Sequence, residues 1–453
     1  MDLNGANDKD KSFYYDYGKQ FYSEAHIIGE KGIDSAECVI FFRFSYSLMT
    51  FAKSTDVRNI GTSYTAYPNI FIDFRDSTGL IKKREKWTDT VSVNSYDSTK
   101  SKSNFYPGFI KVTLPRSISS INIEFRNDQL AALKRDKLNI NLNKFVFGAS
   151  ISNPMLVSLG KTSNSSTSPV LEGSSVEYFE PFILGGNADL NSKNTVMVSY
   201  VKFRQGQEAF NYVIEYIPDK PDDVWGYIQP LSGQVRALPG SEPVFSVSGS
   251  NKLLFSFLLD KMPAIQDGFI SGFLEIPLPA AFMYPGNYVM KVASATDPKD
   301  SLNYNFKVEW VDMPVSLRNA DYAAEMMYYI MTDDEHDELS SGSKLEVLRK
   351  IWNFWKAKDP TKFTIYNEAM AEYFARVDYA FFNYKTLGEK DGAKTERGKV
   401  YILKDAPTQV KRRLEEDKTV EEWYYNNLKQ VYVFETNHSG KYKLRKIENI
   451  VKK

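Results

Sequence analysis

The chain has 453 residues, enough for about three domains of ordinary size. Its 57 lysine and arginine residues balance 57 aspartate and glutamate residues, so the formal net charge of zero gives no general attraction for nucleic acid or anionic lipid. With three histidines and one cysteine, the composition excludes a disulfide framework, a cysteine-based zinc site and most histidine-rich metal centres.

Residues 1–29 are predicted to form an aromatic-rich N-terminal arm. Residues 12–22 read SFYYDYGKQFY and lack the clean period of a strand or a helix. The aromatic side chains of this arm that could dock on a partner are Tyr14, Tyr15, Tyr17, Phe21 and Tyr22. The start of the chain is polar and lacks the apolar stretch of a secretory signal, and no run of about eighteen apolar residues predicts a transmembrane helix.

Residues 30–147 are predicted to form an antiparallel β-sandwich. Apolar and polar residues alternate through residues 40–48, which is the period of a half-buried strand. The alternation returns in four later segments, residues 70–74, 110–114, 121–125 and 138–142. Polar turns, rather than long helices, separate these segments, as is typical of a sandwich. Cys38 lies in the first apolar segment, which favours a buried structural thiol over a nucleophile.

Residues 148–312 are predicted to form a second, immunoglobulin-like β-sandwich. A Ser/Thr-rich stretch at residues 162–168 is typical of a loop or linker. The strands predicted after it are residues 196–203, 212–217, 253–259 and 273–278. A Pro285-Gly286 turn then leads into an alternating apolar run, as at the late strand of many such sandwiches. This similarity is one of architecture and carries no function.

Residues 313–453 are predicted to form an α+β domain. Asn319 can cap a first helix, and Thr332 and Ser343 each begin a capping box with a glutamate three residues later. A further helix carries apolar residues at spacings of three and four up to Tyr384. The strands predicted after the helices are residues 400–403, 422–425, 431–435 and 441–446. The chain is therefore predicted to be multidomain and mainly β, with two antiparallel β-sandwich regions followed by a helical plus small-sheet domain.

Residues 392–403 (GAKTERGKVYIL) lie between these predicted helices and the small sheet. Supporting features stand on either side, Phe354-Trp355 upstream and Glu422-Trp423-Tyr424 downstream. Together they resemble the bacterial GWxTD domain family over about residues 315–450. The positions that fit the family-motif loop are Gly392, Thr395, Arg397 and Gly398, whereas Ala393 replaces the signature Trp and Glu396 replaces the signature Asp.

The resemblance implies a secreted or envelope protein of uncharacterised function, located in the periplasm or at the cell surface, and it transfers no catalytic residue. Two interpretations of the family-motif loop remain open. It is either a polar binding loop or a turn in which Thr395 and Glu396 bond to local backbone and Arg397 pairs with a carboxylate.

Catalytic motifs are scarce in this sequence. Nucleophilic catalysis needs an oriented base, and the three histidines fall in the arm, in a predicted helix and at a hairpin tip. His336 has acidic neighbours, but adjacent residues on a helix diverge, so a solvated acidic first turn is favoured over a metal site. The basic residues 411–413, followed by the acidic residues 415–417, predict ion pairs along a helix face. No catalytic residue, cofactor or metal site is predicted.

The leading hypothesis is a non-catalytic structural or interaction protein of a bacterial envelope-associated or extracellular assembly. It would bind partner proteins through its β-sandwich and GWxTD-like surfaces. The alternative is a carbohydrate-binding or carbohydrate-cleaving protein that uses exposed aromatic residues and paired carboxylates. A third hypothesis, chaperone-like binding at an open sandwich edge, predicts a long unpaired strand. Nucleic acid is not expected as a partner.

Overall fold

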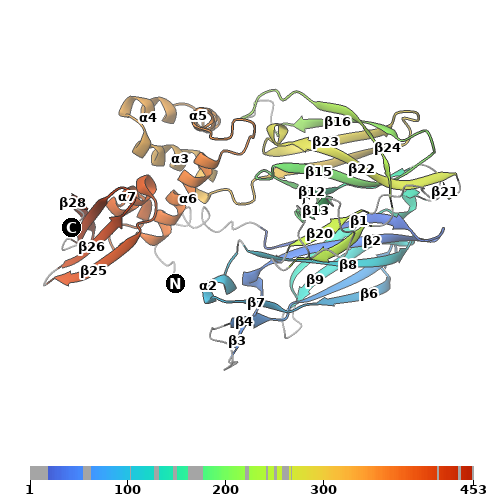
Figure 1. The fold of residues 1–453 in the computed structure, drawn as a ribbon, viewed down its shortest axis with the longest axis horizontal. Coiled ribbons are helices and arrows are strands. Elements are labelled where there is room, and N and C mark those ends of the chain that lie inside the picture. Colours follow the sequence, from blue (N-terminus) through green and yellow to red (C-terminus); the bar gives the residue numbers. More distant parts are fainter. Residues whose placement is uncertain are drawn as a thin grey trace. The chain divides into compact units, whose positions relative to one another are not determined.

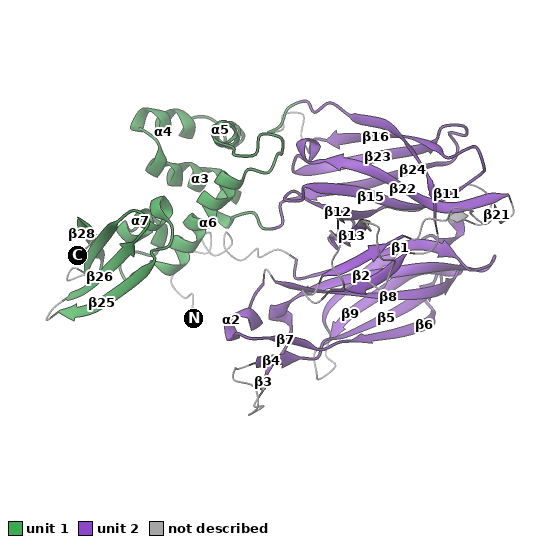
Figure 2. Ribbon diagram, in the orientation of Figure 1, with its two compact units in different colours: residues 1–16, 222–226, 312–453 green, residues 17–221, 227–311 purple. Residues whose placement is uncertain are grey.

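The computed structural model describes the chain except for residues 1–18, 55–62, 103, 127–131, 146–149, 162–176, 220–223, 241–242, 249–251, 258–264, 267, 416–417, 437–439 and 451–453. The protein is mainly β and multidomain, with several antiparallel sheets, two curled half-barrels, and a helical region with a small sheet near the C-terminus (Figure 1). It divides into two compact units, coloured separately in Figure 2. The larger unit holds residues 17–221 and 227–311, and the smaller unit is built mainly from residues 312–453.

Three sheets are built from the first part of the larger unit. The first has the order β1-β2-β8, with β1 at Phe21–Glu30, β2 at Ser35–Ser45 and β8 at Phe105–Pro115. The second has the order β10-β9-β5-β6, with β10 at Ala132–Asn139, β9 at Ile118–Arg126, β5 at Asn69–Asp76 and β6 at Ile81–Thr88. The third joins β3 at Ala52–Ser54, β4 at Ser63–Ala66 and β7 at Val91–Val93, and the short helix α2 follows at Tyr96–Thr99.

Two further sheets complete the larger unit. The nine-stranded sheet comprises β11 Ser150–Ile151, β12 Met155–Lys161, β13 Glu177–Pro181, β15 Asn194–Phe203, β18 Leu238–Pro239, β19 Val244–Val247, β20 Leu253–Ser256, β21 Ile265–Gln266 and β22 Phe269–Pro279. The five-stranded sheet comprises β14 Ala188–Asp189, β16 Ala209–Ile217, β17 Leu231–Arg236, β23 Gly286–Ser294 and β24 Ser301–Glu309. The strands predicted at residues 196–203, 212–217 and 273–278 are thus confirmed.

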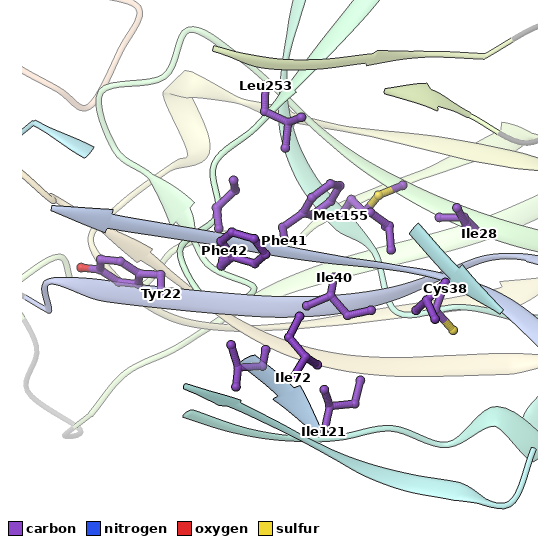
Figure 3. Close-up of a cluster of buried hydrophobic side chains, with 14 of the residues drawn as sticks. Tyr22, Ile28, Cys38, Ile40, Phe41, Phe42, Ile72, Ile121, Met155 and Leu253 are labelled. Carbon is purple, nitrogen blue, oxygen red and sulfur yellow. The ribbon is translucent and has the colours of Figure 1, made fainter. Parts of the chain in front are cut away.

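Strand β2 is buried on both faces, which corrects the prediction of a half-buried strand. Phe41 and Phe42 are both fully buried, although adjacent residues of a strand point to opposite faces. The ring of Phe41 lies 5.6 Å from that of Phe245 on β19, and the ring of Phe42 lies 4.9 Å from that of Trp87 on β6. One cluster of buried side chains therefore takes members from both predicted β regions (Figure 3). Cys38 belongs to it, and burial raises the pKa of its thiol to about 12, as expected for a structural cysteine.

Strand β1 occupies the C-terminal part of the predicted N-terminal arm. Phe21 and Tyr22 pair with β2 and are only 2% and 7% exposed, so these two side chains belong to the core and not to a docking surface. The strand forms because residues 21–30 complete the edge of the β1-β2-β8 sheet, a tertiary partner that the local sequence pattern does not reveal. The other three aromatic residues of the proposed docking arm, Tyr14, Tyr15 and Tyr17, lie outside the described residues.

Three helices of the smaller unit begin at the predicted caps: α3 Ala320–Met327, α4 Asp333–Ser340 and α5 Lys344–Ala357. The other two are α6 Glu368–Asn383 and α7 Glu396–Lys404. The Asn319 side chain accepts hydrogen bonds from the first N–H groups of α3, and Thr332 and Ser343 form the capping boxes of α4 and α5. The small sheet has the order β25-β26-β27-β28, with β25 at Gln409–Glu415, β26 at Lys418–Tyr425, β27 at Gln430–Thr436 and β28 at Tyr442–Asn449.

Two local predictions in this unit were wrong. Residues 400–403 form the end of helix α7 rather than a strand, because a four-residue apolar run has no period that distinguishes a buried helix from a buried strand. Residues 411–413 lie on strand β25 rather than on a helix. Their charges pair across the sheet instead of along a helix face, since Arg412 contacts Glu421 and Arg413 contacts Glu422 of the neighbouring strand.

Because β2 is buried on both faces, substitutions at two adjacent residues are predicted to lower the free energy of unfolding by similar, large amounts. We expect Phe41→Ala and Phe42→Ala each to lower the free energy of unfolding by about 3–5 kcal/mol, because each leaves a cavity in a packed layer. Urea denaturation measures this, with Ile33→Ala as the control, since Ile33 is 75% exposed. A large loss for only one of the two phenylalanines would contradict burial on both faces.

Candidate functional site

The family-motif loop forms a short 3-10 turn, Gly392–Lys394, followed by helix α7. Thr395 is the N-cap of α7. Its hydroxyl accepts a hydrogen bond from the N–H of Gly398 at 3.0 Å and donates one to the carbonyl oxygen of Gly392 at 2.8 Å. Thr395 thus joins both ends of the loop, and its side chain is buried rather than available to a ligand.

The two glycines of the loop allow close backbone packing, Gly392 against helix α6 and Gly398 against the loop itself. A Cβ atom on Gly392 would lie 2.2 Å from the carbonyl oxygen of Ala380, and one on Gly398 would lie 2.0 Å from the carbonyl oxygen of Gly392. Both distances are far shorter than a carbon–oxygen contact allows. Ala393, which replaces the signature Trp, is fully buried, and its carbonyl oxygen accepts a hydrogen bond from the Tyr329 hydroxyl at 3.0 Å.

Glu396 joins helix α7 to the edge of strand β28. Its carboxylate accepts hydrogen bonds from the backbone N–H of Leu444 and from the ammonium group of Lys443, the latter at 3.0 Å. This position therefore stabilises the packing of the helix on the sheet. The interpretation in which Glu396 bonds to local backbone is wrong, because the bonded backbone belongs to the distant strand β28 and not to the loop itself.

Arg397 points into the interior between helix α7 and the small sheet. Its guanidinium lies 3.7 Å from the centre of the Tyr442 ring, and its Nη1 lies 3.4 Å from an oxygen of Glu421. The predicted pairing of Arg397 with a carboxylate is therefore confirmed. Its Nε has no hydrogen-bond partner among the described residues.

Glu421 is the centre of a buried polar cluster. The side chain is 1% exposed, and its two oxygens receive three donors from three positions in the chain. One oxygen accepts from the Arg412 Nε at 2.7 Å and contacts Arg397, and the other accepts from the indole N–H of Trp423 at 2.6 Å. The hydrogen bond and charge of Glu421 in turn raise the pKa of the Arg412 guanidinium.

A cavity of about 520 Å³ opens beside this cluster. Its lining residues come from helix α6 and from strands β25 and β26: Tyr379, Asn383, Tyr384, Val410, Arg412, Glu421 and Trp423. The volume is in the range of small-ligand and peptide side-chain sites. Burial raises the pKa of Tyr384 well above its ordinary value, so its hydroxyl stays protonated. The cavity thus offers aromatic walls and the Arg412 guanidinium, while its carboxylate is already bonded to cations and to an indole.

The five residues of the family-motif loop do not line this cavity; Arg397 reaches it only through Glu421. Sequence reasoning missed the Glu421 cluster. The available signal was the two-residue spacing of Glu421, just before the predicted strand 422–425, and Trp423 within it, since residues two apart on a strand share a face. No sequence pattern indicates which distant cations meet that face.

Neither of the two described histidines, His26 and His336, lines the cavity. His26 is buried in strand β1, 3.4 Å from the Glu24 carboxylate, and not in an exposed arm. His336 on α4 contacts the Ala324 carbonyl oxygen at 3.2 Å, and Glu335 beside it completes the capping box. His438 lies outside the described residues. In the part of the chain that the structure describes, no three His, Cys, Asp or Glu side chains are grouped to hold a metal ion.

Comparison with known families identifies the region that holds the cavity. Residues 286–451 match the family model of the GWxTD domain. The C-terminal part of the chain carries a GWxTD domain. The match begins at β23, earlier than the expected limit near residue 315, and runs through β28. Within the GWxTD domain, the motif loop supports the α6–α7 packing, and the cavity lies between α6 and the small sheet.

Two other comparisons add little to the GWxTD assignment. Among solved structures, a similar chain is the C-terminal domain of the Streptococcus pyogenes antigen I/II-family protein AspA, at 7% identity and a TM-score of 0.14, covering 64% of this chain and 100% of that chain. The comparison with curated proteins found no match. No helix among the described residues has the length and apolarity needed to cross a membrane.

The close packing of Gly398 predicts that replacing this helical glycine with alanine lowers the stability of the protein instead of raising it. Alanine normally favours a helix by about 1 kcal/mol over glycine. We expect Gly398→Ala instead to lower the free energy of unfolding by about 1–3 kcal/mol, because its Cβ would overlap the Gly392 carbonyl oxygen. Urea denaturation provides the measurement. Lys404→Ala, at an exposed site of the same helix, is the control, and a stabilised Gly398→Ala variant would refute the packing argument.

The Glu421 cluster predicts different effects for two adjacent glutamates. We expect Glu421→Gln to lower the free energy of unfolding by about 3 kcal/mol, because it leaves the buried Arg397 without a charged partner. The control is Glu422→Gln on the opposite face, whose partner Arg413 is 56% exposed, and we expect a change below about 1 kcal/mol. Equal effects in urea denaturation would show that the Glu421 cluster is not electrostatically important.

Proposed function

We propose that this protein is a non-catalytic structural or interaction protein of a bacterial envelope-associated or extracellular assembly. In this proposal the two β regions are immunoglobulin-like sandwiches that present the GWxTD domain, and a partner protein binds the groove between α6 and β25. The extracytoplasmic location rests on the family resemblance.

The observation that supports binding rather than catalysis is the state of the groove's carboxylate. Glu421 accepts hydrogen bonds from Arg412 and Trp423 and contacts Arg397, so it has no free proton-transfer role in this arrangement. Strand β25 at this groove, in contrast, exposes apolar side chains. Val410 is 43% exposed and Leu414 is 85% exposed. Exposed apolar side chains around a fixed polar centre are typical of protein-binding surfaces.

A carbohydrate-binding role is the alternative proposal, and one observation favours it. Tyr379 is 47% exposed and lines the same groove together with Tyr384, so the groove carries exposed aromatic surface of the kind that binds sugars. Binding of soluble glycans that is lost in Tyr379→Ala, with the fold unchanged by circular dichroism, would favour this alternative over a protein partner.

The proposed function predicts a stable partner in the native envelope fraction or medium. The experiment is cross-linking in cells followed by affinity purification of the tagged full chain. We expect one protein in constant ratio, lost when Val410→Lys and Leu414→Lys are combined, because two charges then enter an apolar interface.

The matched control combines Ile33→Lys and Tyr227→Lys, which change exposed apolar residues of the larger unit. We expect this control to keep the partner. Recovery of the chain alone would overturn the proposal. So would turnover of a polysaccharide or peptide that is abolished by Glu421→Gln.

A further inference from the structure

Strand β25 is an edge of the small sheet (Figure 1). It pairs with β26 on one side, from Gln409 opposite Tyr424 to Glu415 opposite Lys418. On its other side, no described strand pairs with it, and no backbone hydrogen bond from residues 409–415 leads elsewhere in the described chain. A row of backbone donors and acceptors is therefore available to an additional strand.

One face of this strand carries a simple pattern of side chains. Val410, Arg412 and Leu414 alternate along β25 and share the face that carries Glu421 and Trp423. Val410 and Arg412 also line the cavity, so the unpaired edge and the cavity adjoin. The pattern is apolar, cationic, apolar, and all three side chains are accessible from the open edge.

The cation at the centre is held in place. Arg412 bonds through its Nε to Glu421, while its side chain is 66% exposed. Its orientation is therefore set by the protein, and part of the guanidinium faces outward. Such a guanidinium can bind a carboxylate with little further loss of side-chain freedom.

The pattern argues against pairing with a second copy of the same strand. An antiparallel pair centred on Arg412 would place two guanidinium groups directly opposite each other, and like charges opposite each other destabilise a sheet. Lys411 and Arg413 on the other face add further positive charge to the strand. The edge is therefore protected against self-association and favours a strand of opposite charge.

We propose that β25 binds an extended segment of a partner protein as a fifth strand, with the partner pattern apolar-x-acidic-x-apolar. The acidic side chain lies opposite Arg412, and the two apolar side chains lie opposite Val410 and Leu414. This pattern reads the same in both directions, so it holds for parallel and antiparallel addition. Main-chain hydrogen bonds supply affinity, and the three side-chain positions supply specificity. This inference rests on the proposed interaction function and adds the type of partner segment that would bind.

The test uses fluorescein-labelled synthetic peptides with the full-length protein. One peptide has the core Thr-Val-Thr-Glu-Thr-Val-Thr, and the other has lysine in place of the glutamate. We expect fluorescence anisotropy to show binding of the Glu peptide that is at least fivefold tighter than that of the Lys peptide, and the Arg412→Glu variant to reverse the preference. Hydrogen exchange should slow at the amides of residues 409–415 when the Glu peptide is bound.

A second variant avoids any effect on the Glu421 cluster. Leu414 is 85% exposed, so Leu414→Lys should leave the urea midpoint unchanged and weaken the Glu peptide at least fivefold. The control is Leu387→Lys, at a fully exposed site that is neither on β25 nor among the residues that line the cavity, and it should change neither property. Equal affinities for the two peptides, unchanged exchange at residues 409–415, or no binding at about 1 mM peptide would overturn the inference.

The two proposals fail in different ways. A partner that co-purifies with the chain while neither peptide protects β25 would refute the strand addition and leave the proposed function standing. Peptide binding with the predicted charge preference, but no stable partner in the envelope fraction or medium, would refute the proposed assembly role and leave the peptide-binding edge standing.

Discussion

A carboxylate buried at 1% exposure must find donors inside the protein, and the packing of the C-terminal unit follows this requirement at Glu421. Its donors come from helix α7, strand β25 and its own strand β26. The same carboxylate therefore determines how the helix lies on the sheet and orients the cation at the sheet edge. This carboxylate and the Arg412 guanidinium that it orients both line the cavity.

The glycines of the motif loop leave the space that helix α7 needs to pack on the small sheet. Gly392 lets the loop approach helix α6, and Gly398 lets helix α7 approach the loop, so closely that no side chain fits at either contact. Helix α7 then presents Arg397 to the sheet and Glu396 to strand β28. The family motif in this chain is thus mainly a packing device, and the groove next to it is formed by residues outside the motif.

The interior of the larger unit is also organised around groups that are buried from water. The β1-β2-β8 sheet has buried side chains on both faces, so the two predicted β regions share one cluster of buried residues. A buried polar contact also joins the two regions, because Glu24 on β1 accepts a hydrogen bond from the Gly186 N–H at 2.7 Å. The aromatic richness of the chain is largely explained by this packing, as at Phe41 and Phe42.

The sequence by itself determined the mainly β multidomain class, the positions of strands such as β5, β15 and β26, the caps at Asn319, Thr332 and Ser343, and the GWxTD resemblance. These features depend on local periods and on side chains that bond to nearby backbone. Only the tertiary structure decided that residues 400–403 are helical, that residues 411–413 are an edge strand, and that Phe21 and Tyr22 are core. It also decided where Glu421 finds its cations, because long-range pairing partners are absent from any local pattern.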